Sequence, residues 1–208
     1  MKGERRWSHR GKENPLSKKR IYITGVGGQG TLIATALIGQ AALLAGINAN
    51  LSEIHGMAQR GGIVESSVTL GNLKDPMVSK GEADILLGFE PAETIRAASR
   101  CNPGSVVITN TTPVQPFTVS TGREEYPDLT PALGKLGQRV GKLVQLNADG
   151  LARKAGNILA LNIVMLGALA RHGDLPMTQE QFRESIRKNT KSKFLDMNLK
   201  AFELGYAA

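Results

Sequence analysis

Short apolar runs rich in β-branched residues alternate along the chain with longer segments rich in Ala and Leu. The short runs have the length and composition of buried strands, and the longer segments have good helix propensity. Strands are predicted at residues 20–24, 47–53, 63–70, 83–89, 105–109 and 143–146. Helices are predicted at 31–45, 92–99, 149 to about 171, from 178 onward and at 194–204. This alternation favours an α/β fold, a Rossmann-like three-layer sandwich with a mostly parallel sheet.

Residues suited to helix ends refine these boundaries. Gly46 follows the first helix and is its predicted stop. Asp149 and Thr178 are predicted N-caps, because a short side-chain oxygen there accepts a hydrogen bond from an unpaired amide. Gln181 lies three residues beyond Thr178 and completes a capping box. The last helix places apolar side chains along one face that should pack against the fold: Phe194, Leu195, Leu199, Phe202 and, in some turns, Leu204.

Proline and glycine interrupt the pattern in the middle of the chain. Pro103-Gly104 is predicted to form a turn before the strand at 105–109. Residues 110–141 contain four prolines and four glycines, so we expect mostly loop there, with one edge strand at 117–119.

The positive charge of the chain is concentrated at its start. The net charge is +8 over 208 residues, but residues 1–20 hold eight Lys or Arg against two Glu, so the remainder is nearly neutral. Charge-rich termini bury too little apolar surface to become ordered, which predicts a disordered basic tail at 1–19 and a single domain at 20–208. A docking arm for an acidic partner is the alternative for the tail. A basic tail alone does not indicate nucleic-acid binding.

Neither a membrane segment nor a metal site is indicated. No run approaches the roughly 20 apolar residues of a membrane helix, and no secretory signal is recognisable, so we expect a cytoplasmic protein. Cys101 is the only cysteine, and iron–sulfur clusters usually take about four thiolates. His9, His55 and His172 lie far apart without neighbours at ligand spacing, so no metal site is predicted.

A glycine pattern follows the first strand and opens the first helix. Gly25, Gly27 and Gly30 satisfy G-x-G-x-x-G in the context that gives this pattern meaning. The turn could bind a phosphate at the helix N-terminus, or the glycines could simply permit a tight strand-to-helix crossing. Glu53, 23 residues beyond Gly30, is placed where an NAD site would hold the ribose hydroxyls.

A second candidate segment is the glycine-rich loop that starts near Glu53. His55 could act as a general base with Glu53, but no nucleophile motif accompanies them, so no catalytic residue is assigned. A loop-ordering hydrogen bond or a partner contact is the preferred interpretation of His55. The candidate ligand-binding residues of the turn and this loop are Gly25, Gly27, Gly28, Gln29, Gly30, Glu53, His55, Gln59 and Arg60.

Together these two segments resemble a known family. The residues at 25–30 read GVGGQG and those at 53–62 read EIHGMAQRGG, and this pair resembles the gamma domain of the 2-oxoacid:ferredoxin oxidoreductases, most closely of the indolepyruvate type. Residues 84–91, 157–169 and 198–205 carry the same resemblance, which covers roughly residues 20–206.

The resemblance implies a cofactor-free, non-catalytic small subunit of a heteromeric enzyme. That enzyme oxidatively decarboxylates arylpyruvates to acyl-CoA and passes electrons to ferredoxin. Thiamine diphosphate, Mg²⁺ and [4Fe-4S] clusters belong to the large subunit in that family, while a CoA contact on the small subunit is possible. The alternatives are a gamma subunit for pyruvate, 2-oxoglutarate or branched-chain 2-oxoacids, and a free-standing NAD-binding Rossmann oxidoreductase.

We expect the turn at 25–30 and the loop at 53–62 to lie together, at the carboxyl ends of adjacent strands, where open α/β sheets bind ligands. Arg60 is the residue in this surface best suited to a phosphate or a partner carboxylate, because its guanidinium binds either group.

Overall fold

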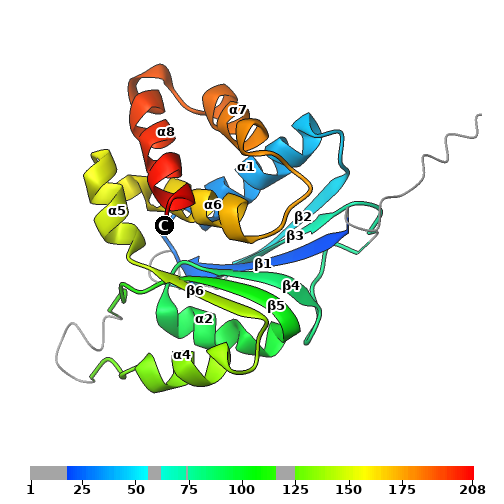
Figure 1. Cartoon of the computed structure of the whole chain (residues 1–208), viewed down its shortest axis with the longest axis vertical. Coiled ribbons are helices and arrows are strands. Elements are labelled where there is room, and N and C mark those ends of the chain that lie inside the picture. Colours follow the sequence, from blue (N-terminus) through cyan, green and yellow to red (C-terminus); the bar gives the residue numbers. More distant parts are fainter. Residues whose placement is uncertain (1–17, 56–61, 74, 116–124) are drawn as a thin grey trace, which may run out of the picture.

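A single six-stranded sheet forms the centre of the protein (Figure 1). The structure is a computed structural model that describes residues 18–55, 62–73, 75–115 and 125–208. The sheet order is β2-β3-β1-β4-β5-β6. Its strands are β1 (Lys19–Val26), β2 (Ala49–His55), β3 (Ile63–Leu70), β4 (Ala83–Gly88), β5 (Cys101–Asn110) and β6 (Lys142–Leu146).

Strand directions make the sheet mostly parallel. β1, β4, β5 and β6 are mutually parallel neighbours, whereas β3 is antiparallel to both β1 and β2. The first strand and the strand at 63–70 form as the apolar pattern predicts, because Ile21, Ile23, Val68 and Leu70 are fully buried.

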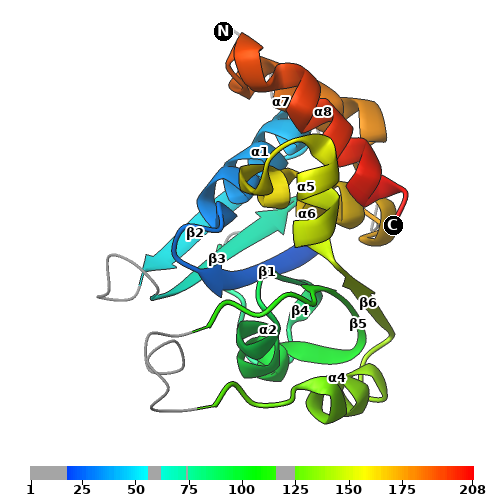
Figure 2. The same cartoon turned by 90° about the vertical axis from the view of Figure 1, so that its left-hand side faces the viewer.

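Helices cover both faces of the sheet and complete three layers (Figures 1 and 2). One face carries α1 (Thr31–Leu44), α5 (Ala148–Ala155), α6 (Leu161–His172), α7 (Gln179–Asn189) and α8 (Ser192–Tyr206). The other carries α2 (Pro91–Ala97) and α4 (Thr130–Gly137). The larger core lies on the first face, and a smaller core around Tyr22, Leu86 and Val107 lies on the second. The predicted α/β three-layer fold is therefore confirmed.

The region between β4 and β6 differs from the sequence-based prediction in two places. Pro103-Gly104 is not a turn before a strand but lies inside β5, where the pairing with β4 shifts register between Ala83 and Ile85. The extra residues of β5 are left out of the pairing with β4, and the Gly104 amide donates to Asn102 Oδ1 at 2.8 Å. In addition, α4 forms in the segment predicted as mostly loop. Pro131 does not prevent it, because this residue sits in the first turn, where a backbone amide would have no intrahelical acceptor. The predicted edge strand at 117–119 lies outside the described residues.

The helix predicted from 149 to about 171 is two helices with a short 3-10 turn, η3 (Ile158–Ala160), between them. Asn147 rather than Asp149 is its N-cap, since the Asn147 side chain accepts from the Gly150 amide at 2.7 Å. Gly156 has φ +138°, which ends α5, and the Asn157 side chain then accepts from the Leu159 amide. A helical apolar period cannot reveal this break, because both halves bury residues of the same core.

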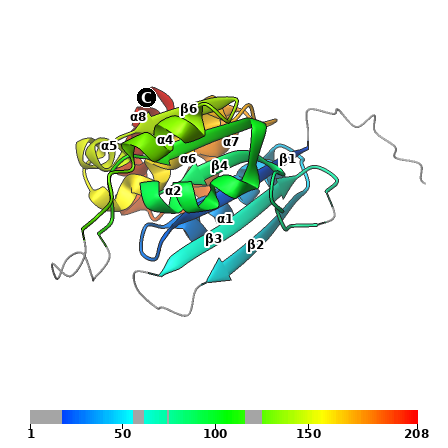
Figure 3. The same cartoon turned by 90° about the horizontal axis from the view of Figure 1, so that it is seen from below.

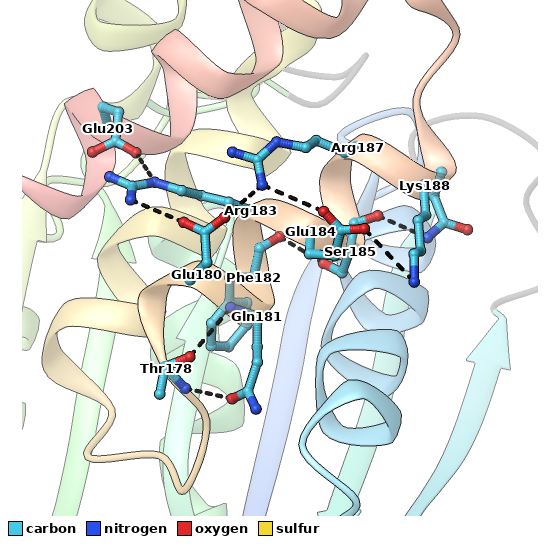
Figure 4. Close-up of polar contacts among 11 residues, drawn as sticks. Thr178, Glu180, Gln181, Phe182, Arg183, Glu184, Ser185, Arg187, Lys188 and Glu203 are labelled. Carbon is cyan, nitrogen blue, oxygen red and sulfur yellow. Dashed lines mark hydrogen bonds and ion pairs between the residues drawn. The ribbon is translucent and has the colours of Figure 1, made fainter.

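The cap predicted for α7 forms, and an ion pair joins α7 to α8. Thr178 and Gln181 form the predicted capping box of α7. Arg183 on α7 links α7 to α8 through Glu203, with 2.7 Å between Nε and Oε1 (Figure 4). Glu180 pairs with both Arg187 and Arg183, and the hydrogen bonds from these two arginines lower the pKa of the Glu180 carboxyl. The face predicted for α8 packs on the core through Phe202, whereas Phe194 is exposed.

Candidate functional site

The carboxyl ends of the parallel strands meet at one edge of the sheet, and we call this the carboxyl edge. β1, β4, β5 and β6 finish there at Val26, Gly88, Asn110 and Leu146. The glycine turn at residues 25–30 leaves β1 at this edge and enters α1. Open α/β sheets bind ligands in this position, so the candidate site is built from here.

The glycines of the turn are required by conformation and by close packing. Gly28 and Gly30 have φ of +102° and +78°, which side-chain-bearing residues rarely adopt. A Cβ on Gly30 would lie 2.9 Å from Asn162 Nδ2, and a Cβ on Gly25 would lie 2.9 Å from Phe89 Cβ. The pattern that predicted a ligand-binding turn is therefore also explained by a crossing in which α1 passes close to α6.

Gln29, a candidate ligand-binding residue, is engaged within the protein. Its Oε1 accepts from the Val26 amide at 2.8 Å, and its Nε2 donates to the Phe89 carbonyl at 2.9 Å. The side chain therefore fastens the end of β1 to the residue that follows β4. Asn110, at the end of β5, donates to the same Phe89 carbonyl at 3.1 Å.

Several amides of the turn are also engaged, which limits how it could hold an anion. The Gly27 amide donates to the Gly62 carbonyl at 2.9 Å, and the Gln29 amide donates to Val26. What remains for a ligand is the start of α1, where Gly30 is the N-cap without a side-chain hydrogen bond and no acidic residue occupies the first turn. The first amides of a helix have no intrahelical acceptors and carry partial positive charge, so this end can accept a phosphate.

The second candidate segment is placed differently from the prediction. β1 and β2 are not adjacent, because β3 pairs between them in antiparallel orientation. Glu53 is exposed on β2 and pairs with Ser66 of β3, so its backbone lies two strand spacings, roughly 10 Å, from β1. An NAD site needs an acidic residue on the strand beside β1, and Glu53 does not occupy that position.

The loop itself is only partly described. His55 is the last residue of β2, while Gln59 and Arg60 lie outside the described residues. The bond from Gly27 to Gly62 joins the glycine turn to the residue that precedes β3. The turn and the end of this loop therefore meet at the carboxyl edge, because the loop leads into β3, the strand that pairs with β1, and not because β2 lies beside β1.

A buried carboxylate that sequence reasoning did not single out organises the rest of this edge. Glu90 is 1% exposed and caps α2, accepting from the Glu93 amide at 2.9 Å. Its other oxygen accepts from the Val114 amide and from the Tyr126 hydroxyl. Burial and this carboxylate raise the pKa of Tyr126, so the phenol stays protonated. The sequence signal was an acidic residue directly after a buried strand and before Pro91, the order of an N-cap and its first helical position.

Neither a cluster nor a metal site is assembled by the described residues. They contain no group of three or more His, Cys, Asp or Glu placed to hold a metal ion. Cys101 lies at the opposite, amino-terminal edge, and burial raises the pKa of its thiol to about 11. No helix in the described ranges is long and apolar enough to cross a membrane.

Comparison with known proteins relates the chain to one family of oxidoreductases. Residues 20–208 match the family model described as pyruvate ferredoxin/flavodoxin oxidoreductase. The chain is 43% identical over 188 residues to indolepyruvate oxidoreductase subunit IorB of Methanothermobacter thermautotrophicus, covering 90% of this chain and 96% of that protein. It is 41% identical over 186 residues to IorB of Archaeoglobus fulgidus, covering 89% and 92%.

Solved structures share the fold. The keto/oxoacid ferredoxin oxidoreductase gamma subunit from Geobacter sulfurreducens superposes with a TM-score of 0.66 at 23% identity, covering 91% of this chain and 96% of that chain. Some similar proteins are longer. The chain covers only 31% of the 2-oxoglutarate:ferredoxin oxidoreductase chain from Magnetococcus marinus (92% of this chain, TM-score 0.67, 18% identity). It likewise covers 35% of ketoisovalerate oxidoreductase subunit VorA of M. thermautotrophicus (89% of this chain, 28% identity).

Proposed function

The chain belongs to the pyruvate ferredoxin/flavodoxin oxidoreductase family, and on this premise we propose that it is the small subunit of an indolepyruvate:ferredoxin oxidoreductase. The observation that carries the proposal is identity above 40% along nearly the full length of two IorB subunits. Subunits named for ketoisovalerate are only 26–28% identical. The substrate is therefore an arylpyruvate, which the complex oxidises and decarboxylates to an acyl-CoA.

The redox chemistry is assigned to a larger partner subunit. An iron–sulfur cluster usually takes about four thiolates, and this chain has a single cysteine whose thiol stays protonated at neutral pH. The residues present do not fit a cluster. Thiamine diphosphate and the clusters belong to the large subunit, and the small subunit is inactive without it.

The role assigned to this chain is to form one wall of the CoA approach at the carboxyl edge. When bound, CoA supplies the thiol that accepts the acyl group. A CoA phosphate would be held at the N-terminus of α1, where Gly28 is exposed and Gly30 leaves the helix amides uncovered by a side chain. His55, Gln59 and Arg60 are proposed from the sequence as further contacts with CoA or with the large subunit. Gln29 and Gly25 support this wall from within, and Glu53 lies at its outer rim.

The experiment uses the complex of the chain with its large subunit. Ferredoxin-dependent oxidation is measured with indolepyruvate, phenylpyruvate, pyruvate, 2-oxoglutarate and 2-oxoisovalerate. The highest kcat/KM is expected with an arylpyruvate, and a clear preference for a branched-chain or short 2-oxoacid would contradict the substrate assignment.

Arg60→Ala tests the CoA wall. We expect it to raise the KM for CoA or to weaken assembly, because a guanidinium that binds phosphate or carboxylate is lost. Arg139→Ala is the matched control, since Arg139 is exposed near the amino-terminal edge. If Arg60→Ala changes neither quantity, the loop has no such role. Removal of residues 1–18 is expected to leave activity of the complex intact, because residues 19–208 contain all six strands of the sheet, including Lys19 at the start of β1.

A further inference from the structure

Helix α1 differs from the other helices on its face of the sheet in having no charged residue. Its 14 residues, TLIATALIGQAALL, include neither an acidic nor a basic side chain. An apolar helix of this kind is normally buried on all sides. Here one side is open, because Ile33 is 58% exposed, Leu43 is 69% exposed and Ala36 is exposed between them.

These exposed positions form one stripe that continues onto the sheet. Ile33, Ala36 and Leu43 recur at the spacing that places residues on one side of a helix. Gly39 of α1 lies against Leu51 of β2, since a Cβ on Gly39 would be 3.1 Å from Leu51 Cδ1. Leu51 is itself 43% exposed. We call the surface made by Ile33, Ala36, Leu43 and Leu51 the α1–β2 face.

The open strand beside this stripe lacks the usual protection of a sheet edge. β2 is the first strand in the sheet order, so its outer edge has no strand partner among the described residues (Figure 3). Proteins protect such edges with Lys, Pro or bulges. β2 reads ANLSEIH and contains neither Lys nor Pro, and its pairing with β3 runs without a register shift.

The neighbouring helix α7 shows what a solvent-facing helix of this protein looks like. Its exposed side carries Glu180, Arg183, Glu184, Arg187 and Lys188, which pair with one another (Figure 4). α1 and α7 pack side by side on the same face of the sheet. The absence of charge on α1 is therefore a local property of one surface and not of the whole protein.

We propose that the α1–β2 face is the surface on which the large subunit docks. The inference rests on the proposed function for the existence of that partner. The occupant follows from the longer relatives, in which a domain like this one makes up 31% or 35% of a continuous chain and so has a permanent neighbour. Interfaces that are permanently covered have apolar, uncharged centres, as this face does.

The position of the face connects it with the candidate site. Ile33 lies in the first turn of α1, three residues beyond Gly30. A partner that covers the stripe therefore reaches the N-terminus of α1 and the carboxyl edge. Glu53, the acidic residue of β2, lies two residues beyond Leu51 on the same side of the strand. It therefore borders the α1–β2 face.

The test introduces one charge into the face at a residue that does not take part in the candidate site. Leu43→Lys alters a largely exposed side chain in the last turn of α1, where a positive charge also suits the helix dipole, so the chain should fold normally. Phe194→Lys, at a 43% exposed residue of α8, is the matched control. Both variants are first checked for an unchanged melting temperature.

The readout is the dissociation constant of each variant for the large subunit. Leu43→Lys is expected to weaken assembly at least tenfold, because burial of a leucine is lost and a charge enters an apolar contact. Phe194→Lys should remain within twofold of the wild type. If the Leu43→Lys variant bound the large subunit with wild-type affinity, the inference would be overturned. It would also be overturned if the substitution dissociated a homodimer of the isolated chain and left binding of the large subunit unchanged. If the wild-type chain itself failed to bind the large subunit, the proposed function would fail first.

Discussion

Gln29 is the residue that best distinguishes a structural role of the glycine turn from a ligand-binding role. Its side chain accepts from the Val26 amide at 2.8 Å and donates to the Phe89 carbonyl at 2.9 Å. Gln29→Ala removes both bonds and leaves the partly buried Val26 amide unpaired. With a net value of about 1 kcal/mol for each of the two bonds and about 1 kcal/mol more for the unpaired amide, the free energy of unfolding should fall by about 3 kcal/mol.

A second substitution checks the same geometry through its pH dependence. Gln29→Glu keeps an acceptor for Val26 but brings a carboxylate against the Phe89 carbonyl. The folded state should therefore hold the proton of this carboxyl more tightly than the unfolded state, because the protonated form can donate to Phe89. A raised folded-state pKa means that the variant loses stability as pH rises through that pKa and regains it as pH falls.

The assay is urea unfolding of the isolated chain, followed by circular dichroism from pH 4 to pH 8. Gln138→Ala, at an exposed residue that ends α4, is the control and should change stability by less than about 0.5 kcal/mol. If Gln29→Ala unfolded at the wild-type midpoint while the complex lost affinity for CoA, Gln29 would be a ligand-binding residue and the structural reading would be refuted.

Four further predictions concern the rest of the fold. Gly205→Ala should destabilise the chain by about 3 kcal/mol in urea unfolding, because its Cβ would lie 1.9 Å from the Val164 carbonyl oxygen. Gly134→Ala, where a Cβ meets nothing within 4 Å in a helix, should instead stabilise it by about 0.5–1 kcal/mol. Cys101 should react slowly with iodoacetamide at pH 8, and because burial raises its pKa to about 11, stability should fall as pH rises from about 9 to 11; a fast reaction at pH 8 would exclude the buried thiol. Arg183→Ala should cost no more than about 1 kcal/mol and should lose its effect in high salt, since its ion pairs are at the surface; an effect that salt did not change would contradict this.

Much of the fold follows from local pattern, whereas strand order does not. The strand at 63–70 was predicted at its observed bounds, because the alternation of its residues is a local signal that does not depend on the rest of the chain. The position of β3 between β1 and β2 was missed, because the sequence pattern of a strand does not show which strands it pairs with in the sheet. The predicted adjacency of the glycine turn and the Glu53 strand was wrong for this reason alone.

The position of the glycine turn was predicted from the sequence, but the contacts within it were not. The glycine spacing correctly placed a turn at the carboxyl edge, because backbone conformation limits such positions to glycine. The roles of Gln29 and Glu90 depend on residues 60 and 24–36 positions away in the chain, and only the folded arrangement brings these together. Whether Gln59 and Arg60 contact a ligand remains a prediction from the sequence.

The central claim is that this chain acts only as a companion of a larger, cofactor-bearing subunit. Its most direct test is a titration in which indolepyruvate-dependent reduction of ferredoxin is measured for the chain alone, for the large subunit alone and for their mixture. The account predicts no turnover by the chain alone and activity that rises with added chain until the subunits are stoichiometric. Turnover of a 2-oxoacid by the purified chain, or full activity of the large subunit without it, would contradict the account.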